Sequence, residues 1–470
     1  WELMPVTSTL LVWHYGGKAV RAGFRYALLH GLGGTLLMAA ILRHYVEVET
    51  FLFASVPGGP ETAGISSGLA AALAAVGIGV NVGFIGLHAW LPDTYPRPHV
   101  AASVFLCVFT TKTGVYGMYR AFPNGHEAIA YMGGGMAIFG ALFALFQNDM
   151  RRLLSYHIQS QVGYMVAGVG IGTSLAQAGA FAHVFNHILY KGLLFMTAGV
   201  VVYRTGEESL KKLGGLAREM PITAIAFTVA ALSIAGFPGF NGFVSKGIII
   251  SGSHYEFVEG PLYFRHRTTL EWMLLIGGVG TFMSFIKFGY YAFFHGTYDG
   301  SVPDANRGQT VAMVSVAALC VFYGLSDASL FALLPFDVTS DAAVGHVYKT
   351  YTTDHIIEGV ALAVAGLVGF AVTKKPLSKL GRVPDIDSLY NPTIFYGSRG
   401  LVVGVTELYA AVDRAVVQAT AVVTRTVTAP NDVITRRRDD DSLVHPMRAG
   451  IGLSMLILAV FVTVALLALS

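Results

Sequence analysis

Apolar segments long enough to cross a lipid bilayer recur along the whole sequence. A transmembrane helix needs about 20 mainly apolar residues, and 54% of the 470 residues are hydrophobic. Charged residues make up only 13% of the chain, whereas soluble domains carry about 25%. The sequence therefore predicts an all-α integral membrane protein. About twelve segments fit a membrane span, and they are 1–15 (partial), 20–42, 67–90, 100–121, 128–147, 153–172, 175–203, 220–253, 268–294, 309–334, 353–373 and 451–469.

Positive charge alternates between the loops that separate these segments. One set of loops is rich in basic residues, including Arg151 and Lys211, and the other set is poorer, with Arg267 and Lys349 among its members. The positive-inside rule places the first set in the cytoplasm. Because the basic residues lie between spans, the net charge of +3 gives no indication of nucleic-acid binding. The chain starts at Trp1 inside an apolar run, so we expect its natural start to lie upstream.

Glycine-rich runs predict that two of the segments are interrupted helices. The segment 220–253 is too long for a simple span, and it contains the run Gly236–Gly242. The segment 67–90 contains four glycines, at positions 77, 79, 83 and 86. Broken helices are tolerated in a membrane only where they line protein or water, and a pair of them points to a binding site in transporters.

Lys246 follows the first of these glycine runs at membrane depth. Between Ala224 and Gly252 it is the only ionisable residue. Ionisable side chains inside a membrane are costly and usually mark an ion or proton path. The alternative is that Lys246 ties two helices together without any transport role.

Other spans carry buried titratable groups as well. Lys112 lies mid-span, with the same alternative of a helix tie, and His183, His187 and Lys191 recur at intervals of four residues. That interval places the last three on one helix face, where histidine and a buried lysine could pass protons. Glu2 lies beside the partial first span, and we expect its carboxylate to be the partner of these buried titratable groups.

Each of these residues also has a simpler interpretation. His183 and His187 have the spacing of a zinc pair but lack its adjacent glutamate, so we expect no metal site. Either histidine could be a satisfied core residue. Lys191, and still more Lys287 near a span end, could extend to the membrane surface. The two cysteines lie in separate apolar runs, where we expect packing and no disulfide.

The pattern changes between residues 374 and 450. Residues 397–428 alternate apolar positions such as Leu401, Val405 and Leu408 with charged ones. This predicts an amphipathic helix that lies along the membrane or a partner subunit. The charged run 436–441 is typical of a solvated turn.

Seven segments together resemble a known family. The chain is similar to the antiporter-like membrane subunits shared by respiratory complex I, membrane-bound hydrogenases and multisubunit sodium/proton (Mrp-type) antiporters. The resemblance runs in family order over about residues 1–295. The residues at Thr111–Tyr116 and Gly242–Lys246 are most similar to those of the D-type subunit of Mrp antiporters or its hydrogenase counterpart. The segments are Trp1–Met4, Leu87–Asp93, Thr110–Gly117, Asn148–Leu154, Ser160–Met165, His183–Phe195 and Gly239–Lys246.

The resemblance implies a polar axis through the membrane and two inverted five-helix repeats, broken at about Gly79–Gly83 and Gly236–Gly242. Glu2 would be the family's membrane glutamate, Lys112 the second lysine of the first half, and Lys246 the end of the second half. His183, His187 and Lys191 would connect the halves. The implied domains are a first half-channel (1–121, incomplete at its start), a second half-channel (122–295), additional transmembrane helices (296–373), an amphipathic surface segment (374–450) and a C-terminal transmembrane helix (451–470).

One position departs from the family pattern. The family has two lysines in its first half, of which Lys112 would be the second. The first should stand six residues before Leu87, and Asn81 occupies that position. Asparagine carries no proton charge, although its amide can hydrogen-bond Glu2 or water. The first half-channel therefore works differently here, or it has lost part of its pumping role. The spans after residue 353 exceed the simplest D-type layout and resemble the larger complex I subunit.

These observations predict proton translocation or sodium/proton exchange by one subunit of an Mrp-type antiporter or related complex. The alternatives are a pumping subunit of a complex I-like or hydrogenase complex, and a largely structural subunit. The expected partners are other membrane subunits, protons or sodium, and the bilayer of a prokaryotic cell, with no nucleic acid. The sequence holds no cysteine cluster, flavin or nucleotide motif, so we expect no cofactor and assign any redox chemistry to partners.

Overall fold

A computed structural model gives the fold of the chain. It describes residues 1–51, 53, 64–66, 68–254, 267–335, 338, 348–379 and 383–428. The chain divides into two compact units, Trp1–Val383 and Pro384–Ser470. The predicted span 451–469 and the charged run 436–441 lie outside the described residues.

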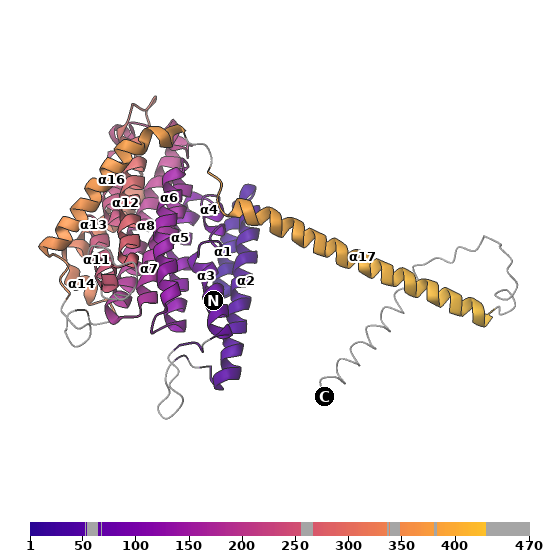
Figure 1. Cartoon of the computed structure of the whole chain (residues 1–470). Helices are drawn as coiled ribbons and strands as arrows, with labels where there is room; N and C mark the ends of the chain where they lie inside the picture. The colour runs from indigo at the N-terminus through magenta and orange to yellow at the C-terminus, as the bar shows by residue number, and fades with distance from the viewer. Residues whose placement is uncertain are drawn as a thin grey trace. The chain divides into compact units, whose positions relative to one another are not determined.

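The described residues are organised as helices, apart from one isolated bridge between Asp149 and Ser209. Figure 1 shows the helices of the first unit standing side by side. In chain order the α-helices of the first unit are α1 (Leu3–Trp13), α2 (Lys18–Val48), α3 (Leu69–Val82), α4 (Trp90–Thr94), α5 (Val100–Ala121), α6 (Glu127–Phe146), α7 (Met150–Ile171), α8 (Ser174–Thr205), α9 (Leu216–Glu219), α10 (Pro221–Ala235), α11 (Asn241–His254), α12 (Thr269–Gly289), α13 (Arg307–Leu325), α14 (Asp327–Phe331) and α16 (Thr353–Lys379). A 3₁₀ turn, η1 (Leu210–Lys212), and a π turn, η2 (Tyr290–Phe294), complete the unit.

Seven helices among the described residues are long and apolar enough to cross a membrane: α2, α5, α6, α8, α12 with η2, α13 and α16. Shorter apolar helices occupy three further predicted spans: α1, α3 and α10. The predicted span 153–172 is α7, which is more polar because His157, Gln159 and Gln161 lie within it. The predicted span 309–334 is wrong at its end, since α13 stops at Leu325 and α14 follows as a separate short helix.

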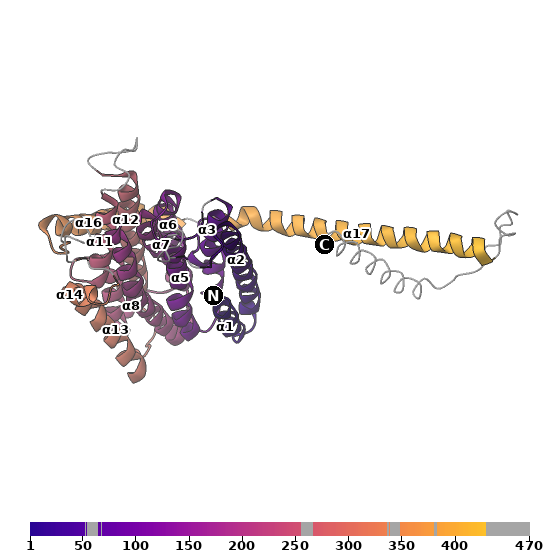
Figure 2. The same ribbon diagram turned by 90° about the horizontal axis from the view of Figure 1, so that it is seen from below.

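Helices α7 and α8 lie in the middle of the first unit, between α1–α3 on one side and α13–α16 on the other, in both views (Figures 1 and 2). Glycines allow α6 and α7 to pack closely, as in many membrane helix pairs. A Cβ on Gly163 of α7 would lie 2.6 Å from the carbonyl oxygen of Gly133 of α6. In the middle of α7 the polar residues His157 and Gln161 are 0% exposed.

Both predicted helix breaks are present. α10 ends at Ala235, Gly236 adopts a left-handed conformation with φ 84°, and α11 begins at Asn241. That conformation suits glycine, because it carries no Cβ. In the other case α3 continues through Gly79 to Val82, and the left-handed Gly83, within the expected range, ends it.

The second unit contains one long described helix, α17 (Asp387–Thr428). Its apolar positions are exposed, with 69% of Leu401, 58% of Val405 and 67% of Leu408 accessible. The predicted segment 397–428 is thus helical, and these apolar side chains are not covered by other described residues of the second unit.

Candidate functional site

Lys246 lies on α11 directly beside the helix break. Its Nζ donates a hydrogen bond of 2.8 Å to the carbonyl oxygen of Ile234 and lies 3.5 Å from that of Ala235. These carbonyls belong to the last turn of α10, which has no further helical donors to satisfy them. Lys246 is only 5% exposed. The ammonium thus stabilises the end of one half-helix from a position on the other.

An aromatic ring holds the same ammonium on its other side. Nζ of Lys246 lies 4.7 Å from the ring centroid of Tyr164, within the range of a cation–π contact. The hydroxyl of Tyr164 donates to the carbonyl oxygen of Leu274 at 2.5 Å. Three helices, α7, α11 and α12, therefore meet at this lysine.

His183 connects α8 to this site. Its Nδ1 lies 2.9 Å from Oγ of Ser245, the residue before Lys246. Its Nε2 lies 3.3 Å from Oε1 of Gln161 and 3.2 Å from the hydroxyl of Tyr190. Every ring nitrogen of His183 thus has a polar neighbour, and the hydrogen-bond direction depends on the tautomer.

The other two residues of the predicted row are equally buried. His187 and Lys191 are 0% exposed, and their side-chain nitrogens have no hydrogen-bond partner among the described residues. Nζ of Lys191 lies 5.9 Å from the ring centroid of Phe285, and the ring of His157 lies 4.7 Å from the same centroid. The side chain of Lys191 therefore does not reach the membrane surface.

The structure also contradicts the surface interpretation of Lys287. This side chain is 2% exposed, and its Nζ donates to the carbonyl oxygens of Leu145 at 2.8 Å and Gln147 at 2.6 Å. Those carbonyls lie at the end of α6. Lys287 turns inward and caps that helix, which is a structural role.

The first half presents a different set of contacts. Lys112 of α5 is 6% exposed, and its Nζ donates to the carbonyl oxygen of Cys107 and to Oγ1 of Thr111. Asn81 of α3 is 0% exposed, and neither amide atom has a partner among the described residues. A Cβ on Gly114 would lie 3.1 Å from the Cβ of Asn81, so the amide-bearing residue faces α5.

Glu2 stands at the N-cap of α1, beside α2. Its side chain is exposed, and a Cβ on Gly34 of α2 would collide with its carboxylate. No hydrogen bond or ion pair joins Glu2 to Asn81 or to a lysine in the described part of the chain.

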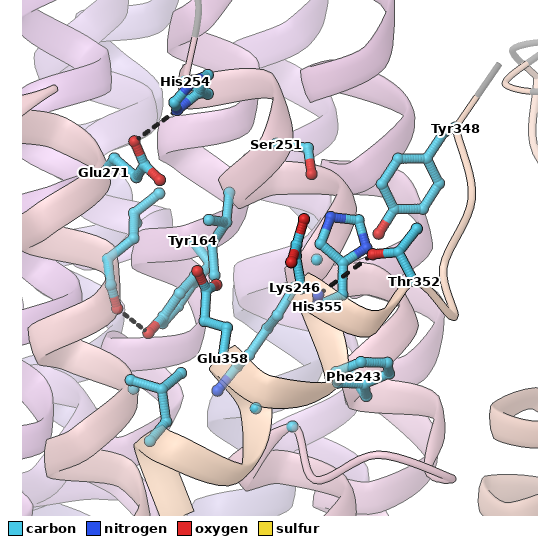
Figure 3. Close-up of a pocket in the computed structure, with 18 of the residues that line it drawn as sticks. Tyr164, Phe243, Lys246, Ser251, His254, Glu271, Tyr348, Thr352, His355 and Glu358 are labelled. Carbon is cyan, nitrogen blue, oxygen red and sulfur yellow. Dashed lines mark hydrogen bonds and ion pairs between the residues drawn. The ribbon is translucent and has the colours of Figure 1, made fainter. Parts of the chain in front are cut away.

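A cavity of about 740 Å³ opens beside Lys246. Figure 3 shows Lys246 and Tyr164 within it, together with Glu271, His254 and Glu358. Its charged and titratable lining consists of Tyr164, Lys246, His254, Arg267, Glu271, Tyr348, Lys349, Asp354, His355 and Glu358. Lys349 and Asp354 are exposed, so the cavity extends from the buried lysine to the protein surface.

Sequence reasoning missed several polar residues of this region. His157, Gln161 and Tyr164 recur along α7 at helical spacing, and each is fully or nearly fully buried. Their spacing was a usable signal, because polar residues at intervals of three and four in an apolar span share one face. Glu271 was missed because it stands at a span end, where a carboxylate is expected to face water.

Comparison with known proteins places the chain in a family. A family model described as NADH:quinone oxidoreductase/Mrp antiporter, TM, matches residues 1–256. The chain is 33% identical over 304 residues to the D-type subunit of the Na⁺/H⁺ antiporter of Alkalihalophilus pseudofirmus, covering 62% of this chain and 60% of that protein. It is 31% identical over 359 residues to hydrogenase-4 component B of Escherichia coli, covering 69% of this chain and 52% of that protein. The chain thus spans between about half and three fifths of the length of these two relatives.

Solved structures share the fold. A chain of the membrane-bound sulfane sulfur reductase, an archaeal respiratory membrane complex, aligns with a TM-score of 0.63 at 25% identity, covering 98% of this chain and 79% of that chain. A chain of the Mrp complex from Dietzia aligns with a TM-score of 0.62 at 20% identity, covering 76% and 74%. The protein is a multi-pass integral membrane protein, and it belongs to the NADH:quinone oxidoreductase/Mrp antiporter transmembrane family.

Proposed function

We propose that the chain carries protons across the membrane, or exchanges them for sodium, as one subunit of a larger membrane complex. Lys246 is the observation that carries this proposal. Its ammonium is buried at a helix break, is followed on one side by the Ser245–His183 contact, and opens on the other side into a cavity that reaches the surface. A group that touches both a buried polar row and an open cavity can exchange protons with each.

The inner part of the path would run from Lys112 through Lys191 and His187 to His183. Helix α5, which carries Lys112, packs against α8, which carries the other three. Buried polar groups in native proteins usually pair with protein or ordered water. The unpartnered nitrogens of His187 and Lys191 therefore support a hydrated connection between Lys112 and His183. Coupling would be electrostatic, because charge on one buried group alters the proton affinity of the next.

The wider arrangement follows the same proposal. Residues 1–121 and 122–295 would form two half-channels built as inverted five-helix repeats, each with one broken helix. Residues 296–373 would add transmembrane helices, 374–450 a surface segment and 451–470 a last span, giving about twelve spans. The breaks after α3 and α10 support this, since one occurs in each half.

The complex would be an Mrp-type antiporter in a prokaryotic cell membrane. The name of the relative from Alkalihalophilus pseudofirmus, a component of a sodium/proton antiporter, supports this assignment. The hydrogenase-4 component favours the alternative of a redox-driven, complex I-like assembly. The apolar side chains of α17 that are exposed among the described residues of the second unit support a neighbouring subunit or the membrane surface as their contact.

A second candidate function is a structural subunit whose neighbours perform the transport. Asn81 favours it, because this buried amide stands where the family pattern has a lysine.

The test is proton and sodium flux through the reconstituted complex with Lys246→Gln. Lys287→Gln is the matched control, because it also removes a buried ammonium bonded to two carbonyl oxygens. We expect Lys246→Gln to abolish flux and Lys287→Gln to retain it in complexes that assemble equally well. Unchanged flux in Lys246→Gln would rule out the transport proposal and favour the structural one.

A further inference from the structure

A buried carboxylate and a half-exposed imidazole meet on the wall of the Lys246 cavity. Oε2 of Glu271 lies 3.1 Å from Nδ1 of His254 (Figure 3). The side chain of Glu271 is 3% exposed, whereas that of His254 is 37% exposed. One hydrogen bond therefore connects a buried carboxylate to an imidazole that solvent can reach.

Glu271 of α12 lines the same cavity as Lys246 of α11. The ring of Tyr164 contacts Lys246 and its hydroxyl binds the carbonyl of Leu274, three residues after Glu271. Three residues of helix rise about 4.5 Å, so Glu271 stands roughly one turn further toward the helix start. The cavity that both residues line has room for a chain of waters, since one water occupies about 30 Å³ in the liquid.

Arg267 fixes the orientation of this carboxylate. One guanidinium nitrogen binds Oε1 of Glu271, and another lies 2.7 Å from Oε2 of Glu358 on α16. Burial disfavours the charge of Arg267, but the hydrogen bonds and charges of Glu358 and Glu271 outweigh it and raise the pKa of the guanidinium. Arg267 therefore stays charged and holds Oε1, which leaves Oε2 for His254.

We propose that Glu271 and His254 form the outer proton shuttle between Lys246 and the solvent, with Arg267 as a positioning residue. This inference rests on the proposed function and adds its last step. Neither residue belongs to the polar row, and both stand on the side that the loop charges predict to be outside. Lys246 would otherwise have to release its proton directly into an open cavity.

The transfer conserves protons at each step. A proton leaves Nζ of Lys246 and passes through cavity water to the carboxylate of Glu271. Oε2 of Glu271 then gives it to Nδ1 of neutral His254, and the proton on Nε2 leaves to the solvent. Exchange of the ring protons with water returns His254 to its first tautomer, as in other histidine relays.

The test measures proton flux through the reconstituted complex carrying Glu271→Gln, His254→Asn or Asp354→Asn. Glutamine keeps the shape of Glu271 but accepts no proton. Asp354→Asn is the matched control, because it removes one carboxylate from the exposed rim of the same cavity. We expect Glu271→Gln and His254→Asn each to lower flux by about a hundredfold, the lower end of the usual effect of a positioned proton-transfer group, and Asp354→Asn to leave flux unchanged.

Chemical rescue separates a shuttle from a structural tie between α11 and α12. Imidazole added on the outer side should restore flux in His254→Asn and have no effect on Glu271→Gln or Lys246→Gln. Because His254 is partly exposed, its variant should assemble even if Glu271→Gln does not. Wild-type flux in His254→Asn, or a loss that imidazole does not relieve, overturns the inference. If Lys246→Gln abolishes flux in the same series, the proposed function stands without it.

Discussion

Nδ1 of His183 lies 2.9 Å from Oγ of Ser245, and this contact joins the polar row on α8 to the helix that carries Lys246. Ser245 directly precedes Lys246, so the row meets α11 next to a residue that lines the cavity. Ser245 can both donate and accept a hydrogen bond, which suits a position between two proton-carrying groups.

Replacing this hydroxyl should interrupt the row. In Ser245→Ala one nitrogen of the buried His183 loses its partner, at a cost of about 1–3 kcal/mol for an unsatisfied buried group, and we expect proton flux to fall. Ser253→Ala is the control, because it removes a hydroxyl from the same helix that binds only the local carbonyl of Ile250. Equal flux in both variants would show that the His183–Ser245 contact carries no protons.

Lys191→Met should lower flux and still leave the fold as stable or more so. The ammonium of Lys191 has no hydrogen-bond partner among the described residues, so its charge is costly to bury. Apolar replacement of buried charges is often neutral or stabilising. Thermal unfolding of the purified complex, followed alongside flux, checks both parts. A marked loss of stability would indicate that Lys191 is a structural tie.

Lys287→Met, in contrast to Lys191→Met, should lower the stability of the fold and leave proton flux unchanged. The carbonyl oxygens of Leu145 and Gln147 would lose their donor at the end of α6, which costs about 1–3 kcal/mol for each buried group left unpaired. We expect a lower unfolding temperature with flux per assembled complex unchanged. Flux that disappears while stability is retained would place Lys287 on the path and contradict its capping role.

Asn81→Lys tests whether the first half is a weakened channel. The asparagine amide is fully buried, without a partner among the described residues, and faces α5. An ammonium there would restore the residue type of the family pattern, and we expect flux to rise. Asn81→Leu is the control for volume and burial. If the lysine variant matches the leucine variant, an alternative path or a structural role is indicated.

Gly242→Ala should damage the helix break more than any other alanine substitution near it. Its Cβ would lie 1.8 Å from the carbonyl oxygen of Ser233, which belongs to α10. We expect loss of assembly or a large drop in unfolding temperature. Gly192→Ala has no atom within 4 Å of its Cβ, so it should gain the usual helix preference of about 1 kcal/mol. Tolerance of Gly242→Ala would show that the two half-helices can move apart at little cost.

The two broken helices could be predicted because the glycines that interrupt them stand close together in the sequence. Gly236 needs a left-handed conformation, and the run Gly236–Gly242 shows this in the sequence itself. The burial of Lys246 and of the row at His183 followed from apolar neighbours in the same way. These features depend on residues close together in the chain.

The cavity wall could not be predicted by this reasoning. Glu271 and His254 are 17 residues apart, and they meet only because α11 and α12 pack together. Lys287 was misjudged for a similar reason, since its partners lie at the end of α6, about 140 residues earlier. A span-end position is compatible with water, with a helix cap or with a cavity, and only packing decides between them.

The hydrogen bond from Lys246 to the end of α10 makes the lysine more than a carrier of charge. Protonated, it supplies the donor that the carbonyl of Ile234 requires and a positive charge where the helix dipole is negative. A proton leaving Lys246 would weaken both interactions at once. Proton release would then change the forces at the joint between the two half-helices, so that a chemical event would acquire a mechanical consequence.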